Sequence, residues 1–167
     1  MEDISLVTVV FMLPLVGVFA LVFVRNLTDY TVRWLTLIVS LITFGASLLL
    51  LRNFDTGVAG LQMVHQWDWI EAGGVTIRYY VGVDGISIWM VLLTTFIMPL
   101  AILASMKTIT ERTRLYYILM LLMEWAMIGV FVAQDLFLFY VFWEVTLVPM
   151  YFLIGIWGAE ERIYAAI

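Results

Sequence analysis

Cysteine is absent from this chain, and histidine occurs once, as His65. Without cysteine there can be no disulfide framework, no thiolate metal site and no cysteine-ligated iron–sulfur cluster. A single histidine cannot by itself hold a haem or a zinc ion, and we interpret His65 as a surface residue in a loop. We therefore expect this chain to hold no cofactor and no metal, so that any redox chemistry is supplied by a partner protein.

Charged residues are also scarce, at 13% of the sequence, and the formal net charge is -5. No run of five or more basic residues occurs, and a nucleic-acid-binding protein needs a basic surface. Nucleic acid is therefore excluded as a partner. Hydrophobic residues, in contrast, make up 65% of the chain, which is more than a soluble domain of this size needs to fill its core. The composition predicts that a lipid bilayer surrounds much of the surface.

Five apolar stretches are long enough to cross a membrane core about 30 Å thick at about 1.5 Å per residue. They are residues 4–24, 34–51, 85–106, 115–133 and 136–157. The first follows Met-Glu-Asp and lacks the basic start of a signal peptide, so we interpret it as a retained helix. The predicted fold class is an all-α integral membrane protein, with residues 1–167 forming a single membrane domain.

Lysine and arginine predict the orientation, because topology follows their distribution among short loops. Six lie on one side of the membrane and two on the other. The six are Arg25, Arg33, Lys107, Arg112, Arg114 and Arg162, and the two are Arg52 and Arg78. This count places the N-terminus outside and the C-terminus in the cytoplasm of a multi-pass protein. The expected location is an energy-transducing membrane, the bacterial plasma membrane.

The long loop between the second and third spans contains two β-prone runs around an Ala-Gly-Gly turn, over residues 63–81. This pattern is typical of a short β-hairpin. We expect the hairpin to lie on the outer membrane surface, because its charged residues would be costly in lipid. Its aromatic residues suit the headgroup region. These are Trp67, Trp69, Tyr79 and Tyr80.

Two glutamates lie deep in the predicted spans: Glu124 is nine residues from either end of the fourth, and Glu144 is eight residues inside the fifth. An acidic residue at mid-membrane costs about 2.5 to 3.5 kcal/mol and is retained where it faces protein or water. One interpretation is a structural hydrogen bond to a neighbouring helix. The other is proton handling, because desolvation disfavours the charged form of a carboxyl group and lets it load and release protons. Both remain open for each residue.

The helix around Glu144 offers supporting groups at helical spacing. Phe137, Tyr140, Leu147 and Tyr151 share its face, and we expect this face to point inward. Pro149 has no N–H, so it frees the carbonyl of residue 145 for a water and favours a kink. Prolines in membrane helices are also often simple bends.

Two aspartates precede predicted spans. Asp135 is interpreted first as an N-cap of the fifth span and second as a functional residue. Asp84, followed by Gly85, is interpreted as a cap of the third span.

Three motifs carry a family resemblance: Val83-Asp-Gly-Ile-Ser with the apolar run that follows, Met123-Glu-Trp-Ala-Met, and Phe139-Tyr-Val-Phe-Trp-Glu-Val-Thr-Leu-Val-Pro-Met-Tyr. With them the chain resembles the M-type, or subunit 4, antiporter-like subunit of respiratory complex I. The resemblance implies a proton-translocating membrane-arm subunit of an NADH:quinone oxidoreductase, partnered by other membrane-arm subunits. It assigns Glu144 to the essential glutamate of the fifth helix and Glu124 to the acidic residue of the fourth.

The resemblance also implies that redox cofactors lie in the peripheral arm, outside this chain. Members of the family have many more helices than five, so we expect these residues to be the N-terminal part of a longer subunit. Two alternatives remain: a subunit of a related cation/proton antiporter or membrane-bound hydrogenase, and a structural scaffold in which both glutamates are merely hydrogen-bonded.

Overall fold

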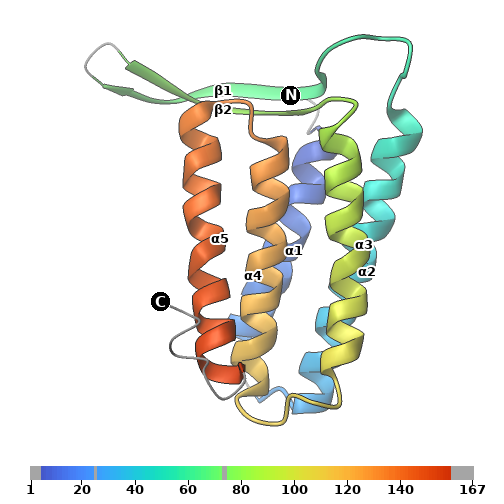
Figure 1. Cartoon of the computed structure of the whole chain (residues 1–167), viewed down its shortest axis with the longest axis vertical. Coiled ribbons are helices and arrows are strands. Elements are labelled where there is room, and N and C mark those ends of the chain that lie inside the picture. Colours follow the sequence, from blue (N-terminus) through green and yellow to red (C-terminus); the bar gives the residue numbers. More distant parts are fainter. Residues whose placement is uncertain (1–4, 25, 73–74, 159–167) are drawn as a thin grey trace.

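Five long helices stand side by side, and a two-stranded sheet lies across one end of them (Figure 1). This computed structural model describes residues 5–24, 26–72 and 75–158, and the side chains of all of these except 69–76. The elements are α1 (Leu6–Phe23), α2 (Asp29–Asn53), β1 (Gln62–Ala72), β2 (Val75–Val83), α3 (Ser87–Ser105), α4 (Thr113–Val132) and α5 (Leu136–Trp157). All five helices are long and apolar enough to cross a membrane. The predicted fold class is confirmed.

The second helix begins at Asp29, earlier than the predicted start at residue 34. Thr28 explains the early start, because its hydroxyl accepts a hydrogen bond from the Thr31 N–H at 3.3 Å and so caps the helix. A prediction based on an uncharged run stops at Arg33, whereas the helix continues through this arginine. The Arg33 guanidinium donates to the carbonyl of Ile109 at 2.8 Å.

Both aspartates accept hydrogen bonds from N–H groups at the start of a helix: Asp135 is the N-cap of α5, and Asp84 lies two residues before Ile86, the N-cap of α3. Asp135 accepts hydrogen bonds from the N–H groups of Phe137 and Leu138, at 2.9 and 3.1 Å. Asp84 accepts from the N–H groups of Ser87 and Ile86, at 2.7 and 2.9 Å. These N–H groups hold the pKa of Asp84 below its usual value, because they stabilise the charged carboxylate.

The predicted hairpin is confirmed: β1 and β2 pair antiparallel, with irregularities in register before His65 and before residue 70. Asp68 and Arg78 form an exposed ion pair across it at 3.1 Å. The link between α4 and α5 extends the sheet, because Ala133 forms a bridge with Val81. The Gln134 N–H also donates to the Tyr80 carbonyl at 2.8 Å. The hairpin is thereby bonded to the start of α5.

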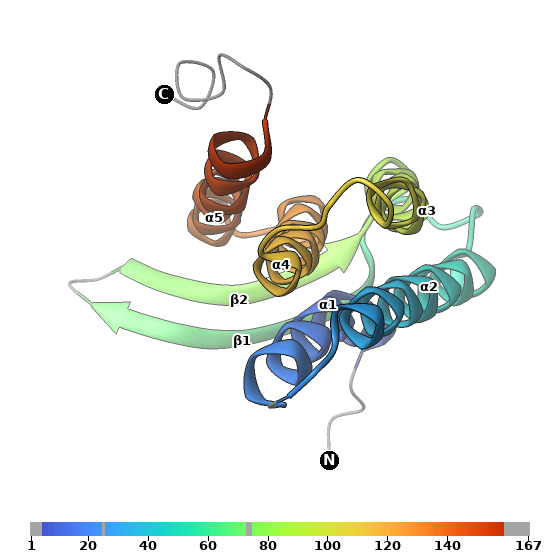
Figure 2. The same cartoon turned by 90° about the horizontal axis from the view of Figure 1, so that it is seen from below.

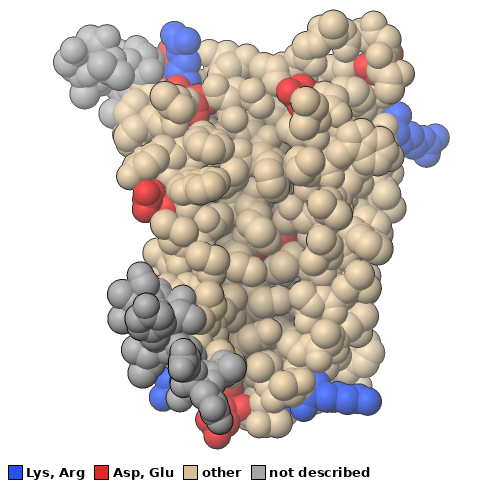
Figure 3. Space-filling model, viewed as in Figure 1, with Lys and Arg blue, Asp and Glu red and all other residues tan. Residues whose placement is uncertain are grey.

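Helix α4 occupies the middle of the helix bundle (Figure 2). It contacts each of the other four helices, whereas α5 packs mainly on α4, with smaller contacts to β2 and, through Phe142, to Phe11 of α1. Buried apolar side chains form two clusters: one next to the hairpin includes Ile128 and Val132 of α4, and one toward the opposite end includes Tyr117 and Leu121. The space-filling view shows a broad, mostly uncharged belt between charged ends, interrupted by acidic side chains (Figure 3). Large exposed apolar residues cover this belt, as expected where the surrounding medium is lipid.

Candidate functional site

Glu124 is completely enclosed, with an exposed fraction of 0%. It lies on α4 between the two apolar clusters, roughly one turn from each. One carboxyl oxygen, Oε1, accepts a hydrogen bond from the Ser40 hydroxyl of α2 at 3.4 Å. The other, Oε2, is buried and has no hydrogen-bond partner. A carboxyl group in this setting is costly to hold ionised, because neither a cation nor a set of donors compensates for its lost hydration.

The hydroxyl that meets Glu124 belongs to a series on one face of α2. Its members are spaced four, three and four residues apart, and all have exposed fractions of 0%: Thr36, Ser40, Thr43 and Ser47. Thr36 and Thr43 donate to carbonyls of their own helix. Ser47 is 2.8 Å from the hydroxyl of Thr95 on α3. The buried polar side chains of the bundle thus lie mainly along α2. Among the buried polar residues that the structure describes, Glu124 is the one acidic residue.

Glu144 has a different environment. It lies on α5 at mid-helix and is exposed, as are the residues of its face: Phe137, Tyr140, Leu147 and Tyr151. The prediction that this face points into the five-helix unit is wrong. Helix α5 packs with its opposite side on α4, where Leu138 and Phe142 are buried. Glu144 therefore faces away from the other four helices.

The three residues predicted to support Glu144 lie at different places in α5 and its N-cap, and only one of them is next to the glutamate. Tyr140 is exposed, and its hydroxyl is within hydrogen-bonding reach of Glu144. Pro149 is buried and lies within α5, which continues through it to Trp157. Asp135 is at the first turn of α5 and uses its carboxylate as a cap. Of the predicted site residues, the structure brings together Tyr140 and Glu144, but not Glu144 and Glu124.

The aromatic residues of the hairpin divide between surface and interior. Trp67 is 46% exposed, whereas Tyr79 stacks on it at 4.3 Å and is only 8% exposed. Burial raises the pKa of the Tyr79 hydroxyl above its ordinary value. The prediction that Tyr79 lies among lipid headgroups is therefore wrong, because its ring belongs to the apolar cluster below the hairpin. The side chain of Trp69 lies outside the described residues.

His65 connects the hairpin to α1. Its Nδ1 is 3.1 Å from the Thr8 hydroxyl, and its ring packs against Trp67 and Tyr79. The histidine is half-buried rather than a free surface residue. Among the described residues, no group of His, Asp and Glu side chains could hold a metal ion.

Sequence reasoning missed Ser40 and the hydroxyl series of α2. The signal was present, since four small hydroxyl residues at helical spacing in an apolar span are typical of a helix–helix contact. Only the fold, however, pairs Ser40 with Glu124, because the two residues are 84 positions apart.

Comparisons with known proteins agree with this architecture. The family model for the amino terminus of NADH-ubiquinone oxidoreductase chain 4 matches residues 72–130. The model for the NADH:quinone oxidoreductase/Mrp antiporter transmembrane family matches residues 133–167. The two matches include α3, α5, all but the last two residues of α4, and both glutamates.

Two curated relatives align along almost the whole chain. NADH-quinone oxidoreductase subunit M of Rhodobacter capsulatus is 45% identical, over 97% of this chain and 31% of the relative. The chloroplastic NAD(P)H-quinone oxidoreductase chain 4 of Chaetosphaeridium globosum is 37% identical, over 99% and 32%. The chain thus spans about a third of the length of the curated relatives it matches.

Among solved structures, a chain of the membrane-bound sulfane sulfur reductase, an archaeal respiratory membrane complex, has the same fold. Its TM-score is 0.70 at 15% identity, covering 92% of this chain and 23% of that one. The structural likeness shows the fold, and the sequence matches show the family. The chain belongs to the family of antiporter-like membrane subunits named subunit M or chain 4 of NADH:quinone oxidoreductases, and corresponds to the N-terminal part of those relatives.

Proposed function

We propose that this protein is a proton-translocating membrane-arm subunit of an NADH:quinone oxidoreductase, in which glutamates at mid-membrane couple quinone reduction to proton transport. The observation that carries the proposal is the contrast between Glu124, enclosed at 0% exposure, and Glu144, presented on an open face of α5. An acidic side chain at mid-membrane that faced lipid would carry a large free-energy cost, so such a residue is retained only where protein or water contacts it. We infer that another membrane segment or subunit covers the Glu144 face.

The different environments of Glu144 and Glu124 suggest different roles for them in proton transport. Glu144 exchanges the proton, because its face is open to groups from outside this five-helix unit and Tyr140 lies beside it. Glu124 holds a proton within the bundle, where Ser40 is its hydrogen-bond partner. Neither step needs a redox group in this chain. We propose that electron transfer belongs to partner subunits and that this chain supplies proton transport alone.

A second candidate is a subunit of a related cation/proton antiporter or membrane-bound hydrogenase. The family model that matches residues 133–167 carries the Mrp antiporter in its description, and the same fold occurs in a sulfane sulfur reductase complex. Co-purification separates the candidates: quinone-reductase subunits are expected with the first, and cation-transport or hydrogenase subunits with the second.

The test of the main proposal is Glu144→Gln, made in the protein within its assembled complex. Glutamine keeps the size and hydrogen-bonding capacity of the side chain but removes the titratable proton. We expect proton translocation and coupled quinone reduction to fall by about a hundredfold or more, in the range of a lost proton-transfer group. Glu144→Asp keeps the proton and should be milder.

Both rates are measured on complexes of normal subunit content, so that an assembly defect is recognised separately. A Glu144→Gln complex that pumps at the wild-type rate would show that this carboxylate is structural. The proposed role of Glu144 would then be abandoned.

We also propose the bacterial plasma membrane as the location, with the N-terminus and the hairpin outside. The support is the distribution of Lys and Arg between the two ends of the bundle.

A further inference from the structure

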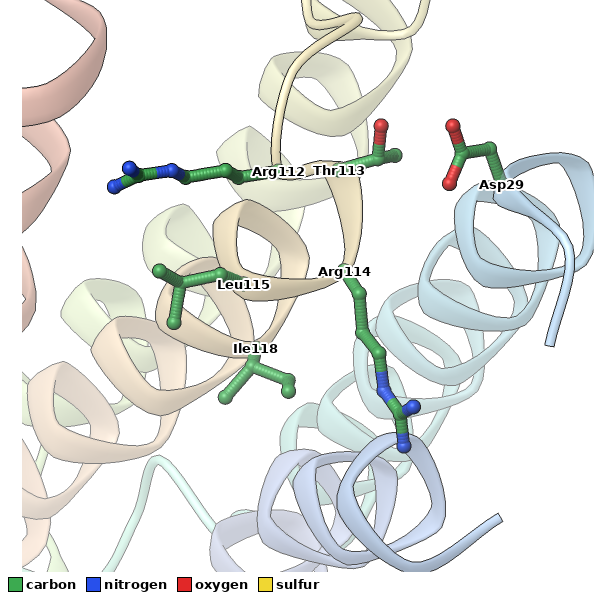
Figure 4. Close-up of a pocket in the computed structure, with 6 residues that line it drawn as sticks. All are labelled: Asp29, Arg112, Thr113, Arg114, Leu115 and Ile118. Carbon is green, nitrogen blue, oxygen red and sulfur yellow. The ribbon is translucent and has the colours of Figure 1, made fainter. Parts of the chain in front are cut away.

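A pocket of about 430 Å³ lies at the end of the bundle opposite the hairpin, where α2 and α4 begin. It is lined by Asp29, Arg112, Thr113, Arg114, Leu115 and Ile118. Figure 4 shows Asp29 facing Thr113, Arg112 extending to the other side of the α4 start, and Arg114 reaching toward α1. The pocket thus joins charged groups at the rim to apolar side chains further along α4.

The start of α4 has no side-chain cap, so the N–H groups of its first turn are free to bind an anion. Thr113 is a second, independent observation that points to a ligand site. It lines this pocket and is only 3% exposed, yet its hydroxyl has no hydrogen-bond partner. A buried hydroxyl without a partner is unfavourable, because it has lost its hydrogen bonds to water and gained none in the protein. A ligand oxygen at this position would satisfy both the hydroxyl and the N–H groups.

The charges of the pocket are incompletely paired. Arg114 donates to three carbonyls at the C-terminal end of α1, those of Leu21, Val22 and Val24. Arg112 and Asp29 are exposed, and neither makes an ion pair within the described part of the chain. The pocket therefore offers a cationic and an anionic group that are both available to a ligand.

We propose that this pocket binds a glycerophospholipid whose headgroup carries a phosphate and a primary ammonium group. The phosphate occupies the start of α4, against the Thr113 hydroxyl, and the exposed Arg112 side chain turns to it. The ammonium group meets Asp29. The acyl chains lie on Leu115 and Ile118, one turn into the membrane. A purely anionic headgroup would leave Asp29 facing a negative charge, so the ammonium-bearing lipid is the better match.

The site is tested by photo-crosslinking on the protein purified from its membrane with the subunits that accompany it. The protein is reconstituted into bilayers containing one of three lipids with a photoactivatable acyl chain: phosphatidylethanolamine, phosphatidylglycerol or phosphatidylcholine. Labelling is mapped by mass spectrometry to the peptide that contains residues 112–118. We expect phosphatidylethanolamine to label this peptide severalfold more strongly than the other two lipids.

The variants separate the two halves of the headgroup. Arg112→Gln and Thr113→Val should each lower labelling severalfold, whereas Asp29→Asn should abolish the preference for phosphatidylethanolamine over phosphatidylglycerol. Arg52→Gln, at the opposite end of α2, removes one exposed arginine and should change nothing. Equal labelling by all three lipids would overturn the proposal. So would loss of labelling in the presence of free inorganic phosphate, which would indicate a phosphate site rather than a lipid site.

Discussion

Glu124 and Ser40 form the one polar contact between α2 and α4 that involves an acidic side chain in the described residues. The contact is long, at 3.4 Å, and it occupies only one oxygen of the carboxyl group. A neutral amide at position 124 would accept the same hydrogen bond. An apolar side chain at position 124 would instead leave the buried Ser40 hydroxyl without this hydrogen-bond partner.

We therefore expect Glu124→Gln to reduce proton translocation less than Glu144→Gln does. Its neighbours on α4, including Met120, Leu121, Met127 and Ile128, offer no polar relay, and no contact connects it to Glu144. The measurement is proton translocation beside quinone reduction in assembled complexes. Ser40→Ala is the complementary variant, because it removes the hydrogen bond but keeps the titratable carboxyl group, and so separates loss of the contact from loss of the proton. An effect of Glu124→Gln as severe as that of Glu144→Gln would make Glu124 an equal member of the proton path.

The depth of the two glutamates was predictable from sequence, because position along an uncharged span determines depth. The side to which each one points was not. Helix α5 is apolar on nearly all sides, so hydrophobic periodicity does not reveal which face contacts α4. The exposure of Glu144 supports the proposed partner outside these five helices, and the sequence of a single span contains no information about such a partner.

The start of α5 depends on Asp135, which accepts from two N–H groups of the first turn. Asp135→Ala removes both hydrogen bonds, and we expect a loss of about 0.5–2 kcal/mol in the free energy of unfolding. Asp135→Asn keeps an acceptor oxygen and should recover most of this loss. Thermal unfolding of the solubilised protein measures both. If Asp135→Ala is fully stable but impairs proton transport, the functional interpretation of this residue is favoured over the cap.

The contact between α4 and α5 depends on the absence of a side chain at Gly129. A Cβ there would lie 2.6 Å from ring atoms of Phe142, whose ring also packs edge-on against Phe11 and Trp125. Because this aromatic cluster cannot shift freely, Gly129→Ala should destabilise the protein by about 1–3 kcal/mol.

Gly45→Ala is the matched control, since a Cβ at Gly45 meets nothing within 4 Å. It should leave the unfolding temperature unchanged or raise it slightly, because alanine favours a helix more than glycine does. Similar destabilisation by both substitutions would show that the close packing on Phe142 is not the cause.

At the scale of elements, the sequence was sufficient for the number of helices, the hairpin and the position of both aspartates at helix starts. These features depend on residues near one another in the chain. The early start of α2 was missed because Arg33 appeared to end the apolar run, whereas its contact with Ile109 comes from a loop 76 residues away. The burial of Tyr79 was missed for the same reason, since residues of α1, α4 and α5 supply its surroundings.

The whole molecule has a predicted orientation that a labelling experiment can check. Single cysteines are placed at Thr108, in the loop between α3 and α4, and at Thr56, in the loop before β1, because the native chain has no cysteine. A membrane-impermeant maleimide applied from outside should label the Thr56 site alone. Labelling of the Thr108 site from outside in intact cells would reverse the proposed topology.

The connection between α4 and α5 has a mechanical consequence. Because Ala133 and Gln134 are bonded to β2, an axial movement of α5 would pull directly on the hairpin. A displacement of the helix that carries Glu144 would thereby be transmitted to the two strands of the hairpin. A fluorophore on the exposed side of β1 would then record motion at mid-membrane in real time, without touching the glutamate itself.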